Sequence, residues 1–250
     1  MYAEPIRGDA LGAALLAQLE QGGDAGRHII ERDDGCVSSD SAELYFLDPA
    51  DSLFTIEASA PRRARGRVLD IGAGAGRFSI EMQNRGHDVV ALDVDAGCLE
   101  VCRRLGVRTT FLGTVFDLAA TEPKPFDTFL LMGHNIGLLG GPQHAPRLLG
   151  ALRSMANPGA RVIGSGREPL MTEDPLALAY HQMNRDRGRP PGQLTLRVRW
   201  GNLASEWFDY WFISTDELGE IAATSGWNLV DVATEEGAHY LVELALDDAD

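Results

Sequence analysis

Five short apolar runs separated by helical segments constrain the fold of this 250-residue chain more than any other feature of its sequence. The runs cover residues 68–71, 88–92, 108–112, 128–132 and 161–165. Most of the segments between them carry apolar side chains at helical spacing, namely residues 76–86, 96–106 and 144–156. Strands that alternate with helices predict a parallel sheet with helices on both of its faces.

The alternation stops after the fifth run and resumes near the C-terminus. Residues 213–227 predict a helix with Ser214 or Thr215 as its cap and Gly226 at its end. Two further strands are expected at residues 227–233 and 240–246. Residues from about 166 to 213 contain two strand-like stretches without helices between them, which predicts an antiparallel insertion after the fifth strand.

The N-terminal part of the chain has a different pattern. Residues 9–21 predict an amphipathic helix that follows a capping aspartate. Residues 22–42 are polar and rich in turn formers, and a second helix is expected around residues 43–60. We therefore expect an N-terminal helical cap or lid over residues 1–65 and a main domain over residues 66–250.

A glycine-rich turn joins the first predicted strand to the next helix, in the sequence VLDIGAGAGRF. The strand ends at Asp70, and the chain then turns through Gly72, Gly74 and Gly76. Glycines at such a turn let the backbone approach a ligand closely. A nicotinamide-binding turn would instead read G-x-G-x-x-G and hold a pyrophosphate at the helix N-terminus. Because a carboxylate at Asp70 would repel a pyrophosphate, the turn favours a ligand with an ammonium group.

A second acid ends the next predicted strand, in the sequence ALDVD. Asp93 lies about 20 residues beyond the glycine turn, where an acid accepts both ribose hydroxyls of a nucleoside ligand. This position suits an aminoacyl nucleoside, and it also suits a dinucleotide. A nicotinamide-dependent oxidoreductase therefore stays as an alternative class, against which Asp70 and the glycine spacing argue.

Residues 68–166 resemble class I S-adenosylmethionine-dependent methyltransferases in these motifs and in the turn NPGARVI. The resemblance implies a Rossmann-like, doubly wound sheet of seven strands with an antiparallel last strand. It implies S-adenosylmethionine as the cofactor and S-adenosylhomocysteine as its product. By position, it assigns the methionine part of the cofactor to Asp70, Gly72, Ala73 and Gly74, the ribose to Asp93, and the adenine to Val94.

One position departs from the family pattern at the adenine end of the expected site. Many relatives have an acid directly after the glycine of the segment GTVFDL, where this sequence has Thr114. We expect Thr114, Val115 and Phe116 to line the adenine end, with Asp117 as a substitute acid.

The segment MGHNIG follows the fourth predicted strand, where open parallel sheets bind their ligands. Gly133 is expected to contact the cofactor, and His134 and Asn135 are the polar candidates for the catalytic centre. A histidine has the right pKa to act as the general base that removes a proton from the acceptor. In the alternative, His134 only orients the backbone or the cofactor, and positioning of the reactants suffices.

The insertion and the N-terminal segment are expected to form the acceptor pocket. Tyr45 and Trp207 offer aromatic surface, and Arg197 or Arg199 is expected to pair with an anionic group of the acceptor. Alternatively, the aromatic side chains belong to a core and the arginines to a solvated face. The insertion also resembles a segment of bacterial methyltransferases of uncharacterised or small-molecule specificity.

Charge and composition exclude several classes of partner. The formal net charge of −15 disfavours nucleic acids, and no apolar run is long enough for a membrane helix. The three cysteines lack metal-site spacing, so we expect no metal and a soluble, cytoplasmic protein.

The motif for methylation of amides and nucleobase amines, D/N-P-P-Y, does not occur in the sequence. The predicted function is therefore methyl transfer to oxygen or nitrogen of a small molecule or a short peptide. A non-catalytic module that binds S-adenosylmethionine or another nucleoside is the alternative from a different class.

Overall fold

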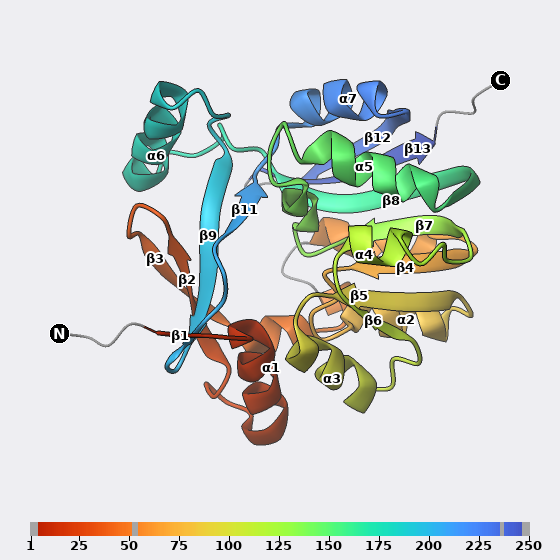
Figure 1. Cartoon of the computed structure of the whole chain (residues 1–250), viewed down its shortest axis with the longest axis horizontal. Coiled ribbons are helices and arrows are strands. Elements are labelled where there is room, and N and C mark those ends of the chain that lie inside the picture. Colours follow the sequence, from red (N-terminus) through yellow and green to blue (C-terminus); the bar gives the residue numbers. More distant parts are fainter. Residues whose placement is uncertain (1–4, 52–54, 236–237, 247–250) are drawn as a thin grey trace.

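The main sheet of the computed structural model has seven strands in the order β12-β13-β8-β7-β4-β5-β6 (Figure 1). The model describes residues 5–51, 55–235 and 238–246. The strands of this sheet are β4 (Arg67–Ile71), β5 (Asp88–Asp93), β6 (Thr110–Leu112), β7 (Phe126–Leu131), β8 (Ala156–Arg167), β12 (Trp227–Glu235) and β13 (His239–Leu246). Strands β4 to β8 are parallel, whereas β13 runs antiparallel to β8 and β12. The predicted doubly wound sheet with an antiparallel last strand is confirmed.

Helices cover both faces of this sheet. Along the chain, helices α2 (Arg77–Asn84), α3 (Ala96–Arg104), α4 (Val115–Ala119), α5 (Ala145–Ser154) and α7 (Thr215–Thr224) lie between strands of this sheet. Neighbouring residues of β4 point to opposite faces: Leu69 packs in one core with Leu148 of α5, and Val68 packs in another with Met82 of α2. The two cores hold the carboxyl ends of the parallel strands at one edge of the sheet.

The caps of two helices explain where these helices begin. Ser214 accepts from the backbone N–H of Glu217, and the Glu217 carboxylate accepts in return from the Ser214 N–H, at the start of α7. Asp9 caps α1 (Ala10–Gln21) by accepting from the N–H of Gly12. Both caps were expected from the sequence. None of the helices in the described residues has the length or the apolar character that crossing a membrane requires.

A second sheet faces the carboxyl ends of the parallel strands, on the left in Figure 1. Its strands are β1 (Ile6–Arg7), β2 (Arg27–Arg32), β3 (Val37–Ser41), β9 (Gln193–Trp200), β10 (Leu203–Ala204) and β11 (Phe208–Trp211). Strand β9 pairs with both β2 and β11 in antiparallel fashion, so the N-terminal segment and the insertion share one sheet. The predicted antiparallel insertion is present, and it also contains helix α6 (Pro175–Asp186), which the sequence did not indicate.

The N-terminal segment is not the helical lid that the sequence predicted. Residues 27–41 form the β2–β3 hairpin, and the expected helix around residues 43–60 is replaced by the 3₁₀ turns η1 (Ala42–Phe46), η2 (Pro49–Asp51) and η3 (Thr55–Arg62). Pro49 of η2 falls inside the expected helix and lacks the N–H that a continuous α-helix needs at that position. Residues 52–54 of the expected helix lie outside the described residues. The proposed boundary at residue 65 stays a prediction.

Candidate active site

The glycine turn after β4 forms one wall of the site. Gly72 and Gly74 have φ angles of +69° and +57°, which favour glycine. A Cβ on Gly72 would lie 2.6 Å from the Nδ2 of Asn135, and a Cβ on Gly74 would lie 3.0 Å from a ring carbon of Tyr45. Both positions thus require glycine, and the turn presents its backbone to a large cavity, which Ala73 also lines.

Asp93 is buried at the carboxyl end of β5, directly beside this turn. One carboxylate oxygen accepts from the N–H of Gly74 at 2.9 Å, and the other accepts from the N–H of Asp95 at 3.0 Å. Burial raises the pKa of Asp93 to about 6, while the backbone donors oppose this shift. Because each oxygen keeps a second lone pair, the carboxylate can accept from two hydroxyls of a ligand in the cavity.

Asp70 is also buried, at the end of β4, and the hydroxyl of Ser79 donates to its carboxylate at 2.7 Å. Burial is the main cause that raises the pKa of Asp70 to about 6. A cation that entered the cavity beside Asp70 would favour its ionised form. Asp70 and Asp93 therefore suit a ligand that carries both an ammonium group and a pair of hydroxyls.

The expected adenine end lies beyond Asp93. Val94 is exposed although it is apolar, and it lines the cavity together with Thr114, Val115 and Phe116. The hydroxyl of Thr114 accepts from the N–H of Asp117, and the Asp117 carboxylate accepts in return from the Thr114 N–H, which forms the capping box of α4. Asp117 is exposed and is not part of the cavity wall, so its assignment as a substitute adenine acid has no support in this geometry.

A buried carboxylate that the sequence did not indicate holds three elements together behind the site. Glu57 of η3 is fully buried and pairs with the guanidinium of Arg77 at 2.9 Å. It also accepts from the N–H of Gly133 at 2.9 Å and from the hydroxyl of Ser165 at 2.5 Å. Glu57 thus ties the glycine turn to the ends of β7 and β8. In the sequence, Glu57 stands in a polar stretch, and no motif there marks it as a buried residue.

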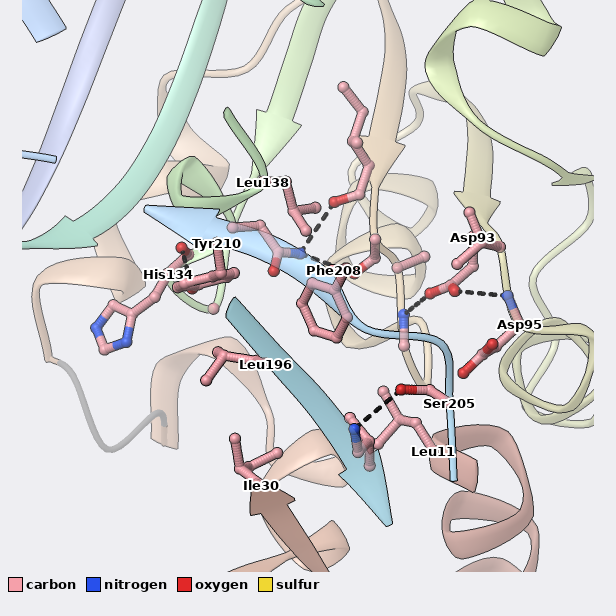
Figure 2. Close-up of a pocket in the computed structure, with 18 of the residues that line it drawn as sticks. Leu11, Ile30, Asp93, Asp95, His134, Leu138, Leu196, Ser205, Phe208 and Tyr210 are labelled. Atoms are coloured by element: carbon pink, nitrogen blue, oxygen red, sulfur yellow. Dashed lines mark hydrogen bonds between the residues drawn. The ribbon is translucent and has the colours of Figure 1, made fainter. Parts of the chain in front are cut away.

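His134 lies at the edge of the cavity with its imidazole against a second histidine. Its Nε2 is 3.0 Å from the Nδ1 of His239, and the two rings stack at a centroid distance of 4.9 Å. In Figure 2 the imidazole points away from Phe208 and Leu196. Burial lowers the pKa of His134 to about 4, which makes its neutral ring a weak base. This geometry favours the orienting role over the role of general base.

The backbone of His134 is held as firmly as its ring. Its φ angle of +66° is unusual for a residue other than glycine. The N–H donates to Ser165 at 2.8 Å, and the carbonyl accepts from the Tyr210 hydroxyl at 2.5 Å. The next residue, Asn135, donates from its amide to the carbonyls of Ile71 and Gly72. These contacts fix the shape of the loop after β7 against the glycine turn.

One cavity of about 1550 Å³ joins these groups to the second sheet. Figure 2 shows Asp93 and Asp95 on one side, and Leu196 and Ile30 on the second sheet below. The volume exceeds the roughly 300–1,000 Å³ of a pocket for one drug-sized molecule. The space can therefore hold a nucleoside cofactor and a second molecule together. Among the described residues, no group of histidine, cysteine and carboxylate side chains is arranged to hold a metal ion.

The four residues that were expected to contact the acceptor do not lie together in the structure. Tyr45 lines the cavity above Gly74. Arg197 and Arg199 both bind the carboxylate of Glu31, at 2.8 and 3.3 Å, and Trp207 lies beneath the Arg197 guanidinium. None of these three lines the described cavity, because they lie away from the face of the second sheet that borders it. The predicted contact of Arg197 or Arg199 with the acceptor therefore has no support in this placement.

Comparisons with known proteins agree with this arrangement. A family model described as a methyltransferase domain matches residues 49–232, which is well over half of the chain. A comparison with the sequences of curated proteins gave no match.

Several solved structures share the fold. An S-adenosylmethionine-dependent methyltransferase from Bacteroides fragilis, in complex with S-adenosylhomocysteine, is 22% identical, with 98% of each chain covered and a TM-score of 0.81. The 1,6-didemethyltoxoflavin-N1-methyltransferase from Burkholderia thailandensis is 21% identical, with 76% of this chain and 75% of that one covered and a TM-score of 0.50. The glycopeptide N-methyltransferase MtfA is 18% identical, with 76% and 86% covered and a TM-score of 0.52.

The matched family model, the strand order and the buried acids beside the glycine turn all lead to one conclusion. The chain belongs to the class I S-adenosylmethionine-dependent methyltransferases, and S-adenosylmethionine is its cofactor.

Proposed function

We propose that this protein transfers the methyl group of S-adenosylmethionine to an oxygen or nitrogen atom of a small molecule or a short peptide. The observation that carries the proposal is the single cavity that runs from Asp93 to the second sheet. It offers more space than the cofactor alone needs, directly beside the loop after β7. Two structural neighbours bear names that state N-methylation of a small molecule and of a glycopeptide.

We assign the cofactor contacts as follows. The Asp93 carboxylate accepts from the ribose hydroxyls, and Asp70 faces the ammonium group of the methionine part. The backbone of Gly72, Ala73 and Gly74 passes along the methionine part of the cofactor. The glycine φ angles and the two buried carboxylates support this assignment.

The adenine end and the reacting end complete the assignment. Val94, Thr114, Val115 and Phe116 surround the adenine, and Gly133 lies near the reacting end. The support for these positions is that all five residues line the cavity.

Catalysis rests on positioning in this proposal. The bound cofactor supplies an electrophilic methyl group on a sulfonium, and the chain has to orient the acceptor atom in line with it. Asn135 holds the glycine turn, while Tyr210 and Ser165 hold the His134 backbone, so the loop beside the reacting atoms is rigid. The stacked, weakly basic imidazole of His134 supports an orienting role rather than proton transfer.

A transfer assay with fractionated metabolites tests the proposal. The protein is incubated with methyl-labelled S-adenosylmethionine and each fraction, and labelled products are identified by mass spectrometry. We expect at least one fraction to accept label from the wild type and from Asp88→Asn, but not from Asp93→Asn. Asp88 is a matched control because it lies at the exposed amino end of the same strand. Tight binding of S-adenosylhomocysteine without transfer to any fraction would favour the non-catalytic binding module instead.

A further inference from the structure

The acceptor half of the cavity has an apolar floor that strand register builds from the second sheet. Side chains two residues apart share one face of a strand, so Leu194, Leu196 and Val198 of β9 point into the cavity together. Leu196 lies opposite Phe208, and Leu194 lies opposite Tyr210 on β11. On the other side of β9, Val198 lies opposite Ile30 of β2. These six side chains, which we call the apolar floor, all border the cavity.

The arginines around the cavity do not offer a site for an anion. Three arginines line it among the described residues, and each is paired with a carboxylate. Arg32 binds both oxygens of Asp34 at 2.9 and 2.8 Å and stacks over the ring of Tyr180. Arg7 pairs with Glu206 at 2.5 Å, and Arg77 pairs with the buried Glu57. An anionic acceptor would have to break one of these ion pairs.

The polar groups nearest the apolar floor are also engaged. The Tyr210 hydroxyl donates to the carbonyl of His134, and the Ser205 hydroxyl accepts from the N–H of Val198 at 2.9 Å and donates to the carbonyl of Glu206 at 2.8 Å. An anionic acceptor would lose its hydration on this floor, and the acidic side chains Asp9, Asp40 and Asp95, which also line the cavity, would repel it. An apolar acceptor gains free energy from the same burial.

From these contacts we infer that the methyl acceptor is a largely apolar small molecule without a negative charge, and that it lies on the apolar floor of the second sheet. The inference rests on the proposed function, because the floor matters to transfer only if the cofactor occupies the glycine-turn side of the cavity. It replaces the expectation of an anionic acceptor held by Arg197 or Arg199.

Two fluorescent probes that differ by one charge test the inference. N-Phenyl-1-naphthylamine is neutral, and 1-anilinonaphthalene-8-sulfonate adds a sulfonate to the same ring system. Each probe is titrated into protein saturated with S-adenosylhomocysteine, so that the cofactor half is not available to it. We expect the neutral probe to bind at least about tenfold more tightly than the sulfonate. Equal or tighter binding of the sulfonate would overturn the inference.

Adjacent isoleucines of β2 provide a matched pair of variants. Ile30 borders the cavity opposite Val198, whereas Ile29 is 38% exposed and pairs with Arg199 away from it. Ile30→Asp should weaken binding of the neutral probe by about tenfold or more, and Ile29→Asp should change it less than about twofold. Equal effects of the two substitutions would contradict a site on the apolar floor. If Ile30→Asp does not fold, Val198→Thr replaces it as the test variant. Its hydroxyl lies on the same apolar floor with little change in volume, so it should also weaken binding of the neutral probe.

Calorimetry with S-adenosylhomocysteine separates the inference from the proposed function. Both isoleucine variants should bind S-adenosylhomocysteine as the wild type does, because neither residue belongs to the glycine-turn side. If the wild type failed to bind S-adenosylhomocysteine, the proposed function itself would fall. If it bound S-adenosylhomocysteine but not the neutral probe, only the inference about the acceptor would fall.

Discussion

Lowering the pH from 7.5 to 5 should weaken the binding of S-adenosylhomocysteine strongly, because two buried carboxylates face the cofactor side of the cavity. Burial raises the pKa of both Asp70 and Asp93 to about 6. With a pKa near 6, a carboxyl group is about 97% ionised at pH 7.5 and only about 9% ionised at pH 5. If binding needs the ionised form, each group raises Kd about tenfold over this range. Both groups together would raise it by up to about 100-fold.

Calorimetric titrations at several pH values measure this dependence. Proton release on binding near pH 6 is expected, and it appears as a heat that depends on the ionisation enthalpy of the buffer. Asp93→Asn should bind more weakly at pH 7.5, by about 1–3 kcal/mol, because its amide cannot accept from two hydroxyls and keep both backbone donors. In this variant, the rise in Kd between pH 7.5 and pH 5 should also be about tenfold smaller than in the wild type. Asp88→Asn, at the other end of β5, should keep the full effect.

A Kd that stays constant between pH 7.5 and 5 would refute the reasoning. It would mean that the carboxylates do not contact the cofactor, or that cofactor binding does not depend on their ionisation. A pH effect that Asp93→Asn retains in full would assign the titration to other groups.

Three further outcomes are expected. Asp70→Asn should stabilise the cofactor-free protein at pH 7.5 while weakening S-adenosylhomocysteine binding. A folded-state pKa raised from 3.8 to about 6 means that ionisation costs stability as the pH rises through that window, and removing the charge should raise Tm by several degrees in calorimetric scans. Glu57→Gln should lower Tm by about 10 °C, because a neutral amide replaces the buried carboxylate that pairs with Arg77, whereas Glu81→Gln in a surface pair should change Tm little. His134→Ala should lower kcat less than tenfold on an identified acceptor and leave the pH profile unchanged. If kcat instead fell 10²-fold or more, and the decrease of the rate at low pH disappeared, His134 would be the general base.

The local patterns of the sequence were sufficient to place the glycine turn, Asp70 and Asp93 together at one edge of the sheet. The glycine turn, the acid before it and Asp93 are close to one another along two neighbouring strands and their turns. Their spacing therefore fixes their relative placement once the parallel sheet is recognised. The caps at Asp9 and Ser214 were readable for the same reason, since each involves residues only three apart.

The second sheet depends on pairings between distant segments, and no local pattern in the sequence reveals such pairings. Strands β2 and β9 are separated by more than 150 residues, and their register decides that Val198 faces the cavity while Arg197 and Arg199 face Glu31. A shift of one residue would have reversed these faces, because side chains alternate along a strand. The hairpin of residues 27–41 escaped notice because it carries few apolar residues.

The role of single side chains was likewise decided by the tertiary structure. Glu57 sits in a polar stretch, yet its contacts with the start of α2, the loop after β7 and the end of β8 bury it completely. His134 was placed correctly after β7, but its ring orientation depends on His239, which lies 105 residues further along the chain. The sequence thus determined the cofactor and the sheet through local spacing. The lining of the cavity on the second sheet, the ring orientation of His134 and the ion pairs of Arg197 and Arg199 followed from long-range contacts that only the folded chain creates.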